Sequence, residues 1–283
     1  MKSSEIFLVF AEKTADNLRL LARARELQIK LTPLPLQQIT VALDESGATR
    51  FFLEARDITT QLKKGRIIFR GKGACVQTAL ALAHFAQRKK IPFTDSVASI
   101  ALVGKSYLPN VILRETQHIP SIFWETQNEL PRKISFRPPF IVKPLNGNRG
   151  RSVRVVKKLN KIKTKNWEPL IIQPQLNFEE EFRIFVLNGK VLAAVAKRKS
   201  AGALAANFAQ GADFVAVKIA RELQNEAIQI CRQLGIEIGG VDFARIGRKY
   251  YFLEANRAPG IIGVERATGI DVGGAILRFI QTK

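Results

Sequence analysis

The stretch that decides the fold is GGVDFARIGRKYYFLEANRAPG, residues 239–260. Its apolar runs predict two strands, 239–243 and 250–254. Glu254 and Asn256 are two residues apart, so their side chains lie on the same face of a strand. Antiparallel pairing would bring Asp242 beside them. Two carboxylates and an amide oxygen form a hard-oxygen site suited to Mg²⁺ held against phosphate groups. The alternative is a set of surface acids paired with nearby cations, namely Arg245, Lys249 or Arg257.

A glycine-rich connection precedes this region, in the run FIVKPLNGNRGRSV at residues 140–153. Lys143 ends the first of two predicted strands, and Gly147 and Gly150 lie in the loop that follows. Glycines let backbone N–H groups approach phosphate oxygens closely, and lysine adds a mobile positive charge. The pattern indicates a phosphate-binding loop. A plain β-turn is the alternative, because many hairpins hold two glycines.

A third segment joins these two, with the strand-like run LIIQPQL at residues 170–176 and the run EEEFR at 179–183. A strand that ends in a short connector can present a backbone carbonyl and an N–H group to the edge of an adenine ring. An acid a few residues further on can hold ribose hydroxyls. The alternative is an ordinary acidic loop.

The composition is that of a globular protein, with 283 residues, 46% of them hydrophobic and 24% charged. This length allows two or three packed subdomains. No apolar run approaches the ~20 residues that a membrane helix requires, so no membrane partner is expected. Cys75 and Cys231 lie apart from any metal-ligand spacing, which predicts two free thiols and a cytoplasmic location.

The net charge of +21 is the unusual property of the chain. Residues 130–167 contain twelve Lys or Arg and no Asp or Glu. Such a surface attracts polyanions, which include nucleic acid, an anionic membrane and an acidic protein. A solvated basic surface without a specific partner is the alternative, and part of the charge can serve a nucleotide.

The first part of the chain predicts a small α/β unit with a largely parallel sheet. Residues 6–10 form a continuous apolar run, which suits a strand buried on both faces. A helix capped by Asp16 follows, then short strands at 40–43, 51–53 and 67–69. Gly71-Lys72-Gly73 leads into an Ala- and Leu-rich helix over 74–87. These glycines are a possible phosphate contact at a helix N-terminus, but they lack the full dinucleotide spacing, so a structural role is favoured.

The second part predicts an α+β unit with antiparallel pairs. Residues 94–124 have a helical pattern broken at Pro109, and strands are expected at 140–142 and 153–156. Residues 182–187 and 191–196 read as a hairpin over Asn188-Gly189. Amphipathic and apolar runs then predict helices over 219–234 and 274–280.

Taken in order, these motifs resemble the ATP-grasp ligases, and RimK-like enzymes most closely. The shared order is a lysine with a glycine loop, a hinge, E-x-R, a Lys-Arg strand end, Asn, Asp and finally E-x-N. The resemblance is most specific from Gly240 to Asp271. It implies an α/β N-terminal domain over 1–93, followed by an α+β ATP-grasp fold in which two α+β subdomains, 94–169 and 170–283, sandwich ATP.

The resemblance also implies a role for individual residues. The ATP phosphates would be contacted by Lys105 and Lys143 and covered by the loop residues Gly147, Gly150, Arg151 and Ser152. The adenine would be contacted by the hinge residues Gln173, Pro174 and Leu176, and the ribose by Glu181. Two Mg²⁺ ions, with Mn²⁺ as a substitute, would be held by Asp242, Glu254 and Asn256. The γ-phosphate and an acyl phosphate would face Arg183, Arg198 and Asn207.

The implied activity is an ATP-dependent carboxylate–amine ligation through an acyl phosphate. An amino acid such as glutamate would be added to an acidic protein or small-molecule carboxylate, by a homo-oligomer. The chain departs from the family around Asn207, where LAANFAQGA at 204–212 lacks the usual arginine and His-Arg-Gly-Gly-like run. The hinge acid and aromatic are replaced by Pro174 and Gln175.

Two alternatives stay open at this point. The first is an ATP-grasp scaffold that serves as a basic nucleic-acid- or ribosome-associated binding module, suggested by the net charge and the altered run near Asn207. The second is a ligase for a cofactor or peptide metabolite, in which the charge serves only solubility.

Overall fold

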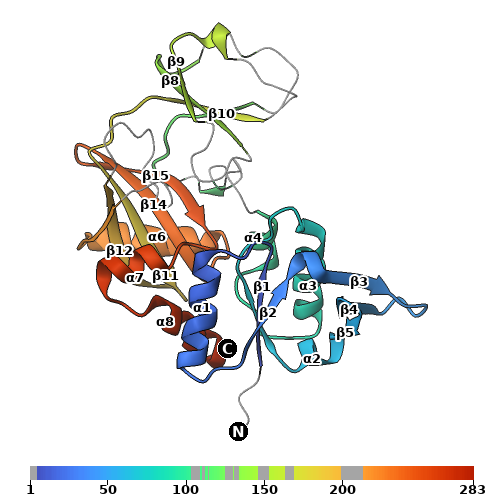
Figure 1. The fold of residues 1–283 in the computed structure, drawn as a ribbon. Coiled ribbons are helices and arrows are strands. Elements are labelled where there is room, and N and C mark those ends of the chain that lie inside the picture. The colour runs from blue at the N-terminus through green and yellow to red at the C-terminus, as the bar shows by residue number, and fades with distance from the viewer. Residues whose placement is uncertain are drawn as a thin grey trace.

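The computed structural model describes residues 5–102, 109, 112–113, 115–124, 130, 134–145, 153–162, 169–198 and 213–283. Three sheet-containing parts are visible in Figure 1: an N-terminal unit, a central sheet, and a C-terminal sheet whose strands carry the predicted metal ligands. Among these residues, no helix combines the length and the apolar character needed to cross a membrane.

The N-terminal unit is built on a parallel sheet of order β2-β1-β6, as the sequence predicted. All five residues of β1 are buried, because helices cover both faces of this sheet. The elements of the unit are β1 (Ile6–Phe10), α1 (Ala15–Glu26), β2 (Leu31–Pro35), β6 (Arg66–Phe69), α3 (Val76–Arg88) and α4 (Val97–Ala101).

A small antiparallel sheet of order β3-β4-β5 projects from this unit (Figure 1). Its turn is stabilised by Asp44, whose carboxylate accepts hydrogen bonds from the backbone N–H groups of Ser46 and Ala48. The elements here are η1 (Leu36–Gln38), β3 (Ile39–Leu43), β4 (Thr49–Leu53), β5 (Arg56–Asp57) and α2 (Thr59–Lys63).

The central sheet has the order β7-β10-β8-β9 and is antiparallel throughout. Its elements are β7 (Ile122–Trp124), β8 (Phe140–Pro144), β9 (Arg154–Val156), η2 (Leu159–Lys161) and β10 (Leu170–Pro174). Residues 122–124 were expected to continue a helix, but they form a strand because their backbone pairs with β10. Residues 170–174 also belong to this sheet by their pairing, whereas the predicted division placed them with the C-terminal subdomain.

The C-terminal sheet has the order β13-β12-β11-β14-β15, with every neighbouring pair antiparallel. The predicted hairpin over Asn188-Gly189 and the two predicted strands of 239–254 are confirmed. The elements are β11 (Glu180–Leu187), β12 (Lys190–Arg198), β13 (Asp213–Ala216), α6 (Arg221–Gln233), β14 (Ile238–Ile246), β15 (Lys249–Asn256), α7 (Ile262–Thr268) and α8 (Val272–Thr282).

The two faces of the C-terminal sheet pack against different partners. One face carries Ile184 and Val241 and is covered by α6 through Leu223 and Ile230. The other face carries Phe185 and packs against β1 and α1 of the N-terminal unit and against α8. This hydrophobic core contains residues from both ends of the chain, and it joins the N-terminal unit to the C-terminal sheet.

The cap of α1 differs from the prediction. Thr14, and not Asp16, caps this helix by accepting a hydrogen bond from the backbone N–H of Asn17. The Asp16 carboxylate instead accepts from the backbone N–H groups of Ile261 and Ile262, at 2.7 and 3.0 Å. Sequence could not anticipate this, because the partners of Asp16 lie at the beginning of α7, about 245 residues further along the chain.

Candidate functional site

The pairing of the strands places five polar side chains on one face of the C-terminal sheet. Four of them were predicted from the sequence, and the fifth, Lys197, was not. Arg183 on β11 lies opposite Asp242 on β14, which lies opposite Glu254 on β15. Glu181 on β11 lies opposite Lys197 on β12. Residues opposite each other on antiparallel strands point to the same side, so these side chains converge. The predicted pairing of Asp242 with Glu254 is therefore confirmed.

Asp242 is the centre of this group and is only 1% exposed. Its Oδ1 accepts a hydrogen bond of 2.7 Å from Arg183 Nε, and its Oδ2 accepts one of 2.7 Å from Arg183 Nη2. Lys197 Nζ donates to the same Oδ2 and also to Glu181 Oε1, the latter at 2.7 Å. A planar guanidinium that grips a carboxylate with two bonds is a strong and geometrically specific arrangement.

Burial and ion pairing together determine the pKa values of Asp242 and Glu181. Burial opposes the charged form of Asp242, but the charges and hydrogen bonds of Arg183 and Lys197 outweigh it, so the pKa of Asp242 lies below its ordinary value. Burial raises the pKa of Glu181 above its ordinary value, although the charge of Lys197 opposes the rise. The charge of Lys197 therefore favours the ionised form of both carboxyl groups.

Glu254 and Asn256 form the more exposed side of the group. The Glu254 side chain is 38% exposed, and its Oε1 accepts a hydrogen bond of 2.8 Å from Asn256 Nδ2. Arg183 Nη2 lies 3.9 Å from the same Oε1. The bond to Glu254 uses the amide nitrogen of Asn256 and leaves its amide oxygen, which is the atom that a metal ion requires. Glu254 and Asn256 thus present carboxylate and amide oxygens toward solvent.

Oxygens of Glu254 and Asn256 are open to a magnesium ion that is shared with a phosphate ligand, whereas Asp242 is buried and both of its oxygens accept hydrogen bonds from Arg183 or Lys197, so its role as a metal ligand stays a prediction. Three carboxylates (Glu181, Asp242, Glu254) face two cations (Arg183, Lys197), which leaves one negative charge at the exposed side. Within the described residues, no group of three or more His, Cys, Asp or Glu side chains is arranged to hold a metal. An ion here would need oxygens from phosphate and water to complete its shell, as is usual for Mg²⁺.

Four residues predicted for the nucleotide lie in or just after the central sheet. Lys143 on β8 lies opposite Ile171 on β10. Gln173 donates a hydrogen bond of 2.7 Å from Nε2 to Ser121 Oγ, which fixes the end of β10. Pro174 is the last residue of β10, and Leu176 lies in the connector between β10 and β11. Their contacts with phosphate and adenine stay predictions.

Several predicted residues fall outside the described parts of the chain: Lys105, Gly147, Gly150, Arg151, Ser152 and Asn207. The backbone of Arg198 is described and pairs with Asp213, but its side chain is not. The residue that sequence reasoning missed is Lys197, because only Arg198 was selected from the Lys-Arg pair at this strand end. The sequence pattern carried no signal for Lys197, because a regular hairpin would place Ala196, and not Lys197, opposite Glu181.

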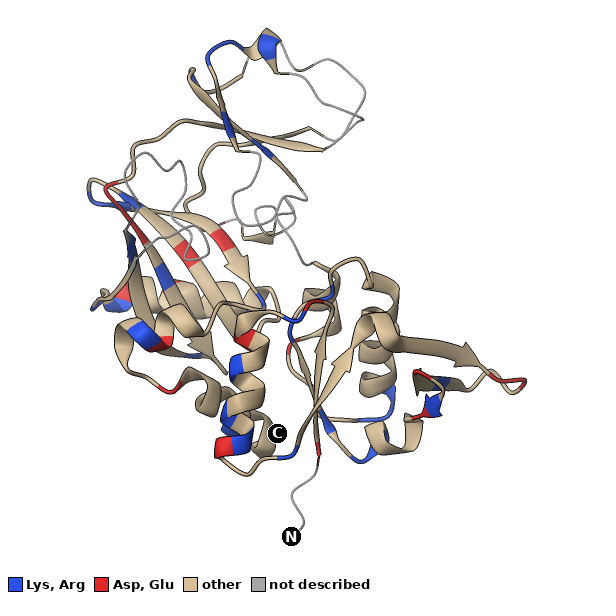
Figure 2. Ribbon diagram, viewed as in Figure 1, with Lys and Arg blue, Asp and Glu red and all other residues tan. Residues whose placement is uncertain are grey.

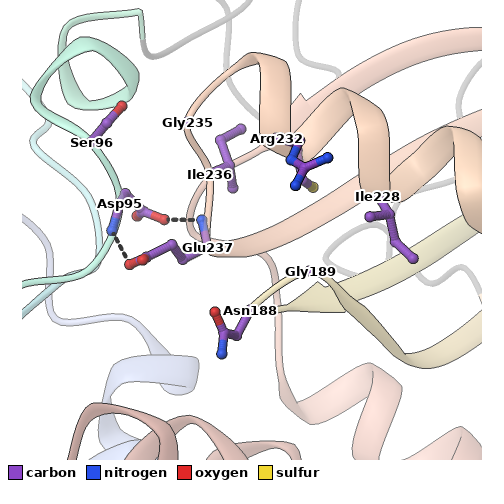
Figure 3. Close-up of a pocket in the computed structure, with 10 residues that line it drawn as sticks. Asp95, Ser96, Asn188, Gly189, Ile228, Arg232, Gly235, Ile236 and Glu237 are labelled. Carbon is purple, nitrogen blue, oxygen red and sulfur yellow. Dashed lines mark hydrogen bonds between the residues drawn. The ribbon is translucent and has the colours of Figure 1, made fainter. Parts of the chain in front are cut away.

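A cavity of about 540 Å³ lies elsewhere, between the N-terminal unit and the C-terminal sheet. Figure 3 shows Asp95 and Ser96 on one side and the Asn188-Gly189 turn and Glu237 on the other. Reciprocal hydrogen bonds join the two sides, from Asp95 N to Glu237 Oε2 and from Glu237 N to Asp95 Oδ1. None of the residues predicted for nucleotide or metal lines this cavity.

The described part of the central sheet carries Lys and Arg but no Asp or Glu, whereas both signs of charge occur on the other parts of the protein (Figure 2). The described residues of 134–174 contain no Asp or Glu. Their cations are Arg137, Lys143, Arg154, Lys157, Lys158 and Lys161. All of these except Lys143 are exposed, so this part of the protein presents a basic surface.

The chain is similar in sequence to a known domain family and to curated proteins. Residues 97–280 match the model of the RimK-like ATP-grasp domain. A probable alpha-L-glutamate ligase of Parasynechococcus marenigrum (strain WH8102) is 33% identical over 154 residues, which cover 51% of this chain and 33% of that protein. One of the same name from Legionella pneumophila (strain Corby) is 31% identical over 156 residues, 51% of each chain. The chain thus spans a third to a half of the length of these curated relatives.

Solved structures share the fold over nearly the whole chain. The ATP-grasp ligase PsnB complexed with minimal precursor has a TM-score of 0.73 at 18% identity, with 99% of each chain covered. The D-alanine–D-alanine ligase of Bacillus anthracis complexed with ATP has a TM-score of 0.66 at 15% identity, with 99% of this chain and 97% of that chain covered. These likenesses confirm the predicted fold class. The chain belongs to the RimK-like ATP-grasp family.

Proposed function

We propose that this protein is an ATP-dependent carboxylate–amine ligase that forms an amide bond through an acyl phosphate. The observation that carries the proposal is the group of Arg183, Lys197, Asp242, Glu254 and Asn256 on one face of the C-terminal sheet. It supplies fixed positive charge beside oxygen donors for a metal, which is what phosphoryl transfer from ATP requires.

In the first step, a carboxylate oxygen of the acceptor attacks the γ-phosphorus of ATP. The new O–P bond forms as the bond to ADP breaks, and ADP leaves with the electron pair. Glu254, Asn256 and Asp242 would hold Mg²⁺, which neutralises charge on the phosphate oxygens. Arg183 cannot turn away, because its two bonds to Asp242 fix the guanidinium, so it offers a preorganised positive charge to the transferring group.

In the second step, an amine nitrogen attacks the acyl carbon. The C–N bond forms, phosphate leaves with the electrons of the C–O bond, and the amine proton passes to a phosphate oxygen or to water. No protein nucleophile is required. Glu181 would accept hydrogen bonds from the ribose hydroxyls, and Pro174 and Leu176 would offer backbone groups to the adenine.

The amine is proposed to be an amino acid such as glutamate, because the curated relatives are named as probable alpha-L-glutamate ligases. The acceptor is proposed to be an acidic protein or small carboxylate. Support for an acidic acceptor comes from the five exposed cations of the central sheet and from the net charge of +21. Nucleic acid is the competing ligand for the same surface, and the experiment below separates the two.

The test measures ADP formation from ATP and Mg²⁺ with a panel of L-amino acids and acidic peptides, together with intact-mass analysis of the peptides. We expect ADP only when an amine and a carboxylate are both present, and a peptide mass increased by the amino acid minus water. Glu254→Gln should abolish turnover, while Glu222→Gln, the same change on α6, should not.

Two outcomes would contradict the proposal. One is the absence of ADP formation across the panel with folded protein. The other is salt-sensitive RNA binding that is retained by a double variant, Asp242→Ala with Glu254→Ala, while no peptide gains mass. The second result would instead indicate a nucleic-acid-binding module.

A further inference from the structure

Three buried or nearly buried cations gather where β6 and β15 end. Arg70 follows β6, Lys72 is two residues further on, and Arg257 follows β15; they are 6, 9 and 5% exposed. Arg70 Nη2 donates a hydrogen bond of 2.8 Å to the carbonyl of Pro259, and Arg257 Nη1 donates one of 3.1 Å to the carbonyl of Phe69. Arg70 of the N-terminal unit therefore bonds to the segment that follows β15, and Arg257 of that segment bonds to the end of β6 in the N-terminal unit.

These arginines have donors that remain unused. In the described part of the chain, Arg70 Nε, Arg70 Nη1 and Arg257 Nε are buried without a hydrogen-bond partner. A buried charged donor without an acceptor costs free energy, and native proteins hold few of them. A bound ligand that supplies the missing acceptor would remove this free-energy cost. Three unused donors in one cluster point to an anion.

The charge balance supports the same ligand. Asp95 Oδ2 lies 3.4 Å from Arg257 Nη1, and Asp16 acts on Arg70 only through its charge. Three cations against two carboxylates leave one positive charge in excess. Burial is the main reason that the pKa of Arg70 is lowered to about 10; the charge of Asp16 opposes this lowering and the charge of Arg257 contributes to it. Burial and then Arg257 likewise lower the pKa of Lys72. An anion bound among these three side chains would relieve their mutual repulsion.

The helix that follows adds backbone donors. α3 has 13 residues, its N-cap Cys75 makes no side-chain hydrogen bond, and its first turn contains no acid. The N–H groups at such an end favour negative charge. Lys72 lies directly before this helix, in the Gly71-Lys72-Gly73 segment for which a structural role was favoured from sequence alone. Because Lys72 lies in the same cluster as the unused arginine donors, the structure supports a role of this segment in binding an anion.

The cluster adjoins the candidate site through one layer of side chains. A Cβ atom placed on Gly240 would lie 2.7 Å from Pro259 Cβ and 3.6 Å from Arg183 Cδ. Gly240 is also the strand partner of Asn256, which directly precedes Arg257. Pro259, which accepts from Arg70, is therefore packed between the cation cluster and the Arg183–Asp242 pair.

We propose that Arg70, Lys72 and Arg257 form a subsite for the non-reacting α-carboxylate of the amino-acid substrate; the inference rests on the proposed function. A carboxylate matches the single positive charge in excess, whereas the complete phosphate chain of ATP carries several negative charges. Of the two lysines predicted for the ATP phosphates, Lys143 lies on a different sheet, and Lys105 is outside the described residues. Binding there would leave the amine of the same molecule free to reach the acyl carbon.

The test is isothermal titration of the full-length protein with L-glutamate, in the presence of Mg²⁺ and the non-hydrolysable ATP analogue AMPPNP. Lys72→Met removes a charge at the edge of the cluster and loses one hydrogen bond, from Lys72 Nζ to the carbonyl of Ala101. Lys89→Met is the matched control, because Lys89 is exposed at the other end of α3. Lys72→Arg retains the charge. Circular dichroism establishes that each variant is folded.

We expect Lys72→Met to raise the dissociation constant of glutamate at least tenfold. Lys89→Met and Lys72→Arg should stay within twofold of the unaltered protein, and the affinity for AMPPNP should be the same in all. Glutamate α-amide, which lacks the α-carboxylate, should bind the unaltered protein at least tenfold more weakly than glutamate.

Equal glutamate affinity in Lys72→Met and the unaltered protein would overturn the subsite, as would equal affinity for glutamate and its α-amide. Failure of the unaltered protein to bind glutamate would overturn it too. The ligase proposal is judged separately, by ADP formation with the full amino-acid panel. Turnover that is insensitive to Lys72→Met would therefore reject the subsite and leave the ligase proposal standing.

Discussion

Arg183 and Asp242 face each other on adjacent antiparallel strands and are joined by two hydrogen bonds of 2.7 Å, with Asp242 almost wholly buried. Asp242→Asn would leave Arg183 and Lys197 beside a neutral side chain. Removing one partner of a buried ion pair is strongly destabilising, so we expect a loss of about 3–5 kcal/mol in the free energy of unfolding. Urea denaturation at neutral pH measures it.

Glu254→Gln is the control for this prediction, because it removes the same charge from the same face at a side chain that is 38% exposed. Its free energy of unfolding should change by less than about 1 kcal/mol. Comparable losses in the two variants would show that Asp242 has no special structural role and that its pairing with Arg183 contributes little.

Lys197 holds Glu181 and Asp242 together, and its removal should alter the pH dependence of ATP binding. The charge of Lys197 opposes the rise that burial causes in the pKa of Glu181. In Lys197→Met the pKa of Glu181 should therefore rise further, so that a larger fraction of Glu181 is protonated at any given acidic pH. Because a protonated carboxyl accepts hydrogen bonds from ribose less well, the KM for ATP should increase on acidification at a higher pH than in the unaltered protein.

Lys190→Met is the matched control, since Lys190 is exposed at the other end of the same strand, β12. Its profile of KM against pH should overlay that of the unaltered protein. A Lys197→Met profile that also overlays it would remove the link between Lys197 and Glu181, and with it the proposed ribose contact.

Much of this arrangement could be predicted from sequence, because it depends on local pattern. The period of two places Glu254 and Asn256 on one face, and Asn188-Gly189 indicates the hairpin of β11 and β12. The continuous apolar run of β1 predicts burial on both faces, as observed. These features require only the residues of one strand or turn.

The site itself depends on two β-bulges that pattern does not reveal. A regular two-residue hairpin would place Ala196 opposite Glu181, but a register shift at Phe185/Val186 places Lys197 there. A second shift, at Asp242/Phe243, brings Glu254 opposite Asp242 in place of Leu253. One extra residue in a strand moves every later side chain of that strand to the other face of the sheet. The two bulges therefore decide which side chains make up the site.

Acid should weaken the contact between the two ends of the chain. The Asp271 carboxylate accepts hydrogen bonds from Arg23 of α1 and from the backbone N–H of Gly274 in α8. The bond from Arg23 is the main reason that the pKa of Asp271 is lowered to about 2. A carboxyl with a lowered pKa in the folded protein stabilises it above the ordinary pKa of 3.8, and the effect is lost as pH falls toward 2.

Asp271→Asn should therefore be less stable than the unaltered protein at pH 6, and the difference should shrink between pH 4 and pH 2. Urea denaturation across this range measures the two free energies of unfolding. Glu45→Gln, the same charge change in the exposed β3–β4 turn, should give no such convergence. A difference between Asp271→Asn and the unaltered protein that is constant with pH would contradict the assignment of the low pKa to Asp271.

Gly240 is the position at which the site and the cation cluster meet, and it has no room for a side chain. A Cβ atom there would lie 2.7 Å from Pro259 Cβ, which is closer than two carbon atoms can pack, so Gly240→Ala must displace the segment that carries Pro259. Overpacking of this kind costs about 1–3 kcal/mol.

Gly260→Ala is the control, because the nearest neighbour of its added Cβ atom would be Asp16 Oδ2 at an ordinary 3.5 Å. Since Pro259 accepts from Arg70 and lies beside Arg183, Gly240→Ala should lower both the free energy of unfolding and the rate of ADP formation, while Gly260→Ala should change neither by much. Equal stability of the two variants in urea would mean that the Pro259 segment yields freely, and that the cluster is not held in place by the strand that carries Asp242.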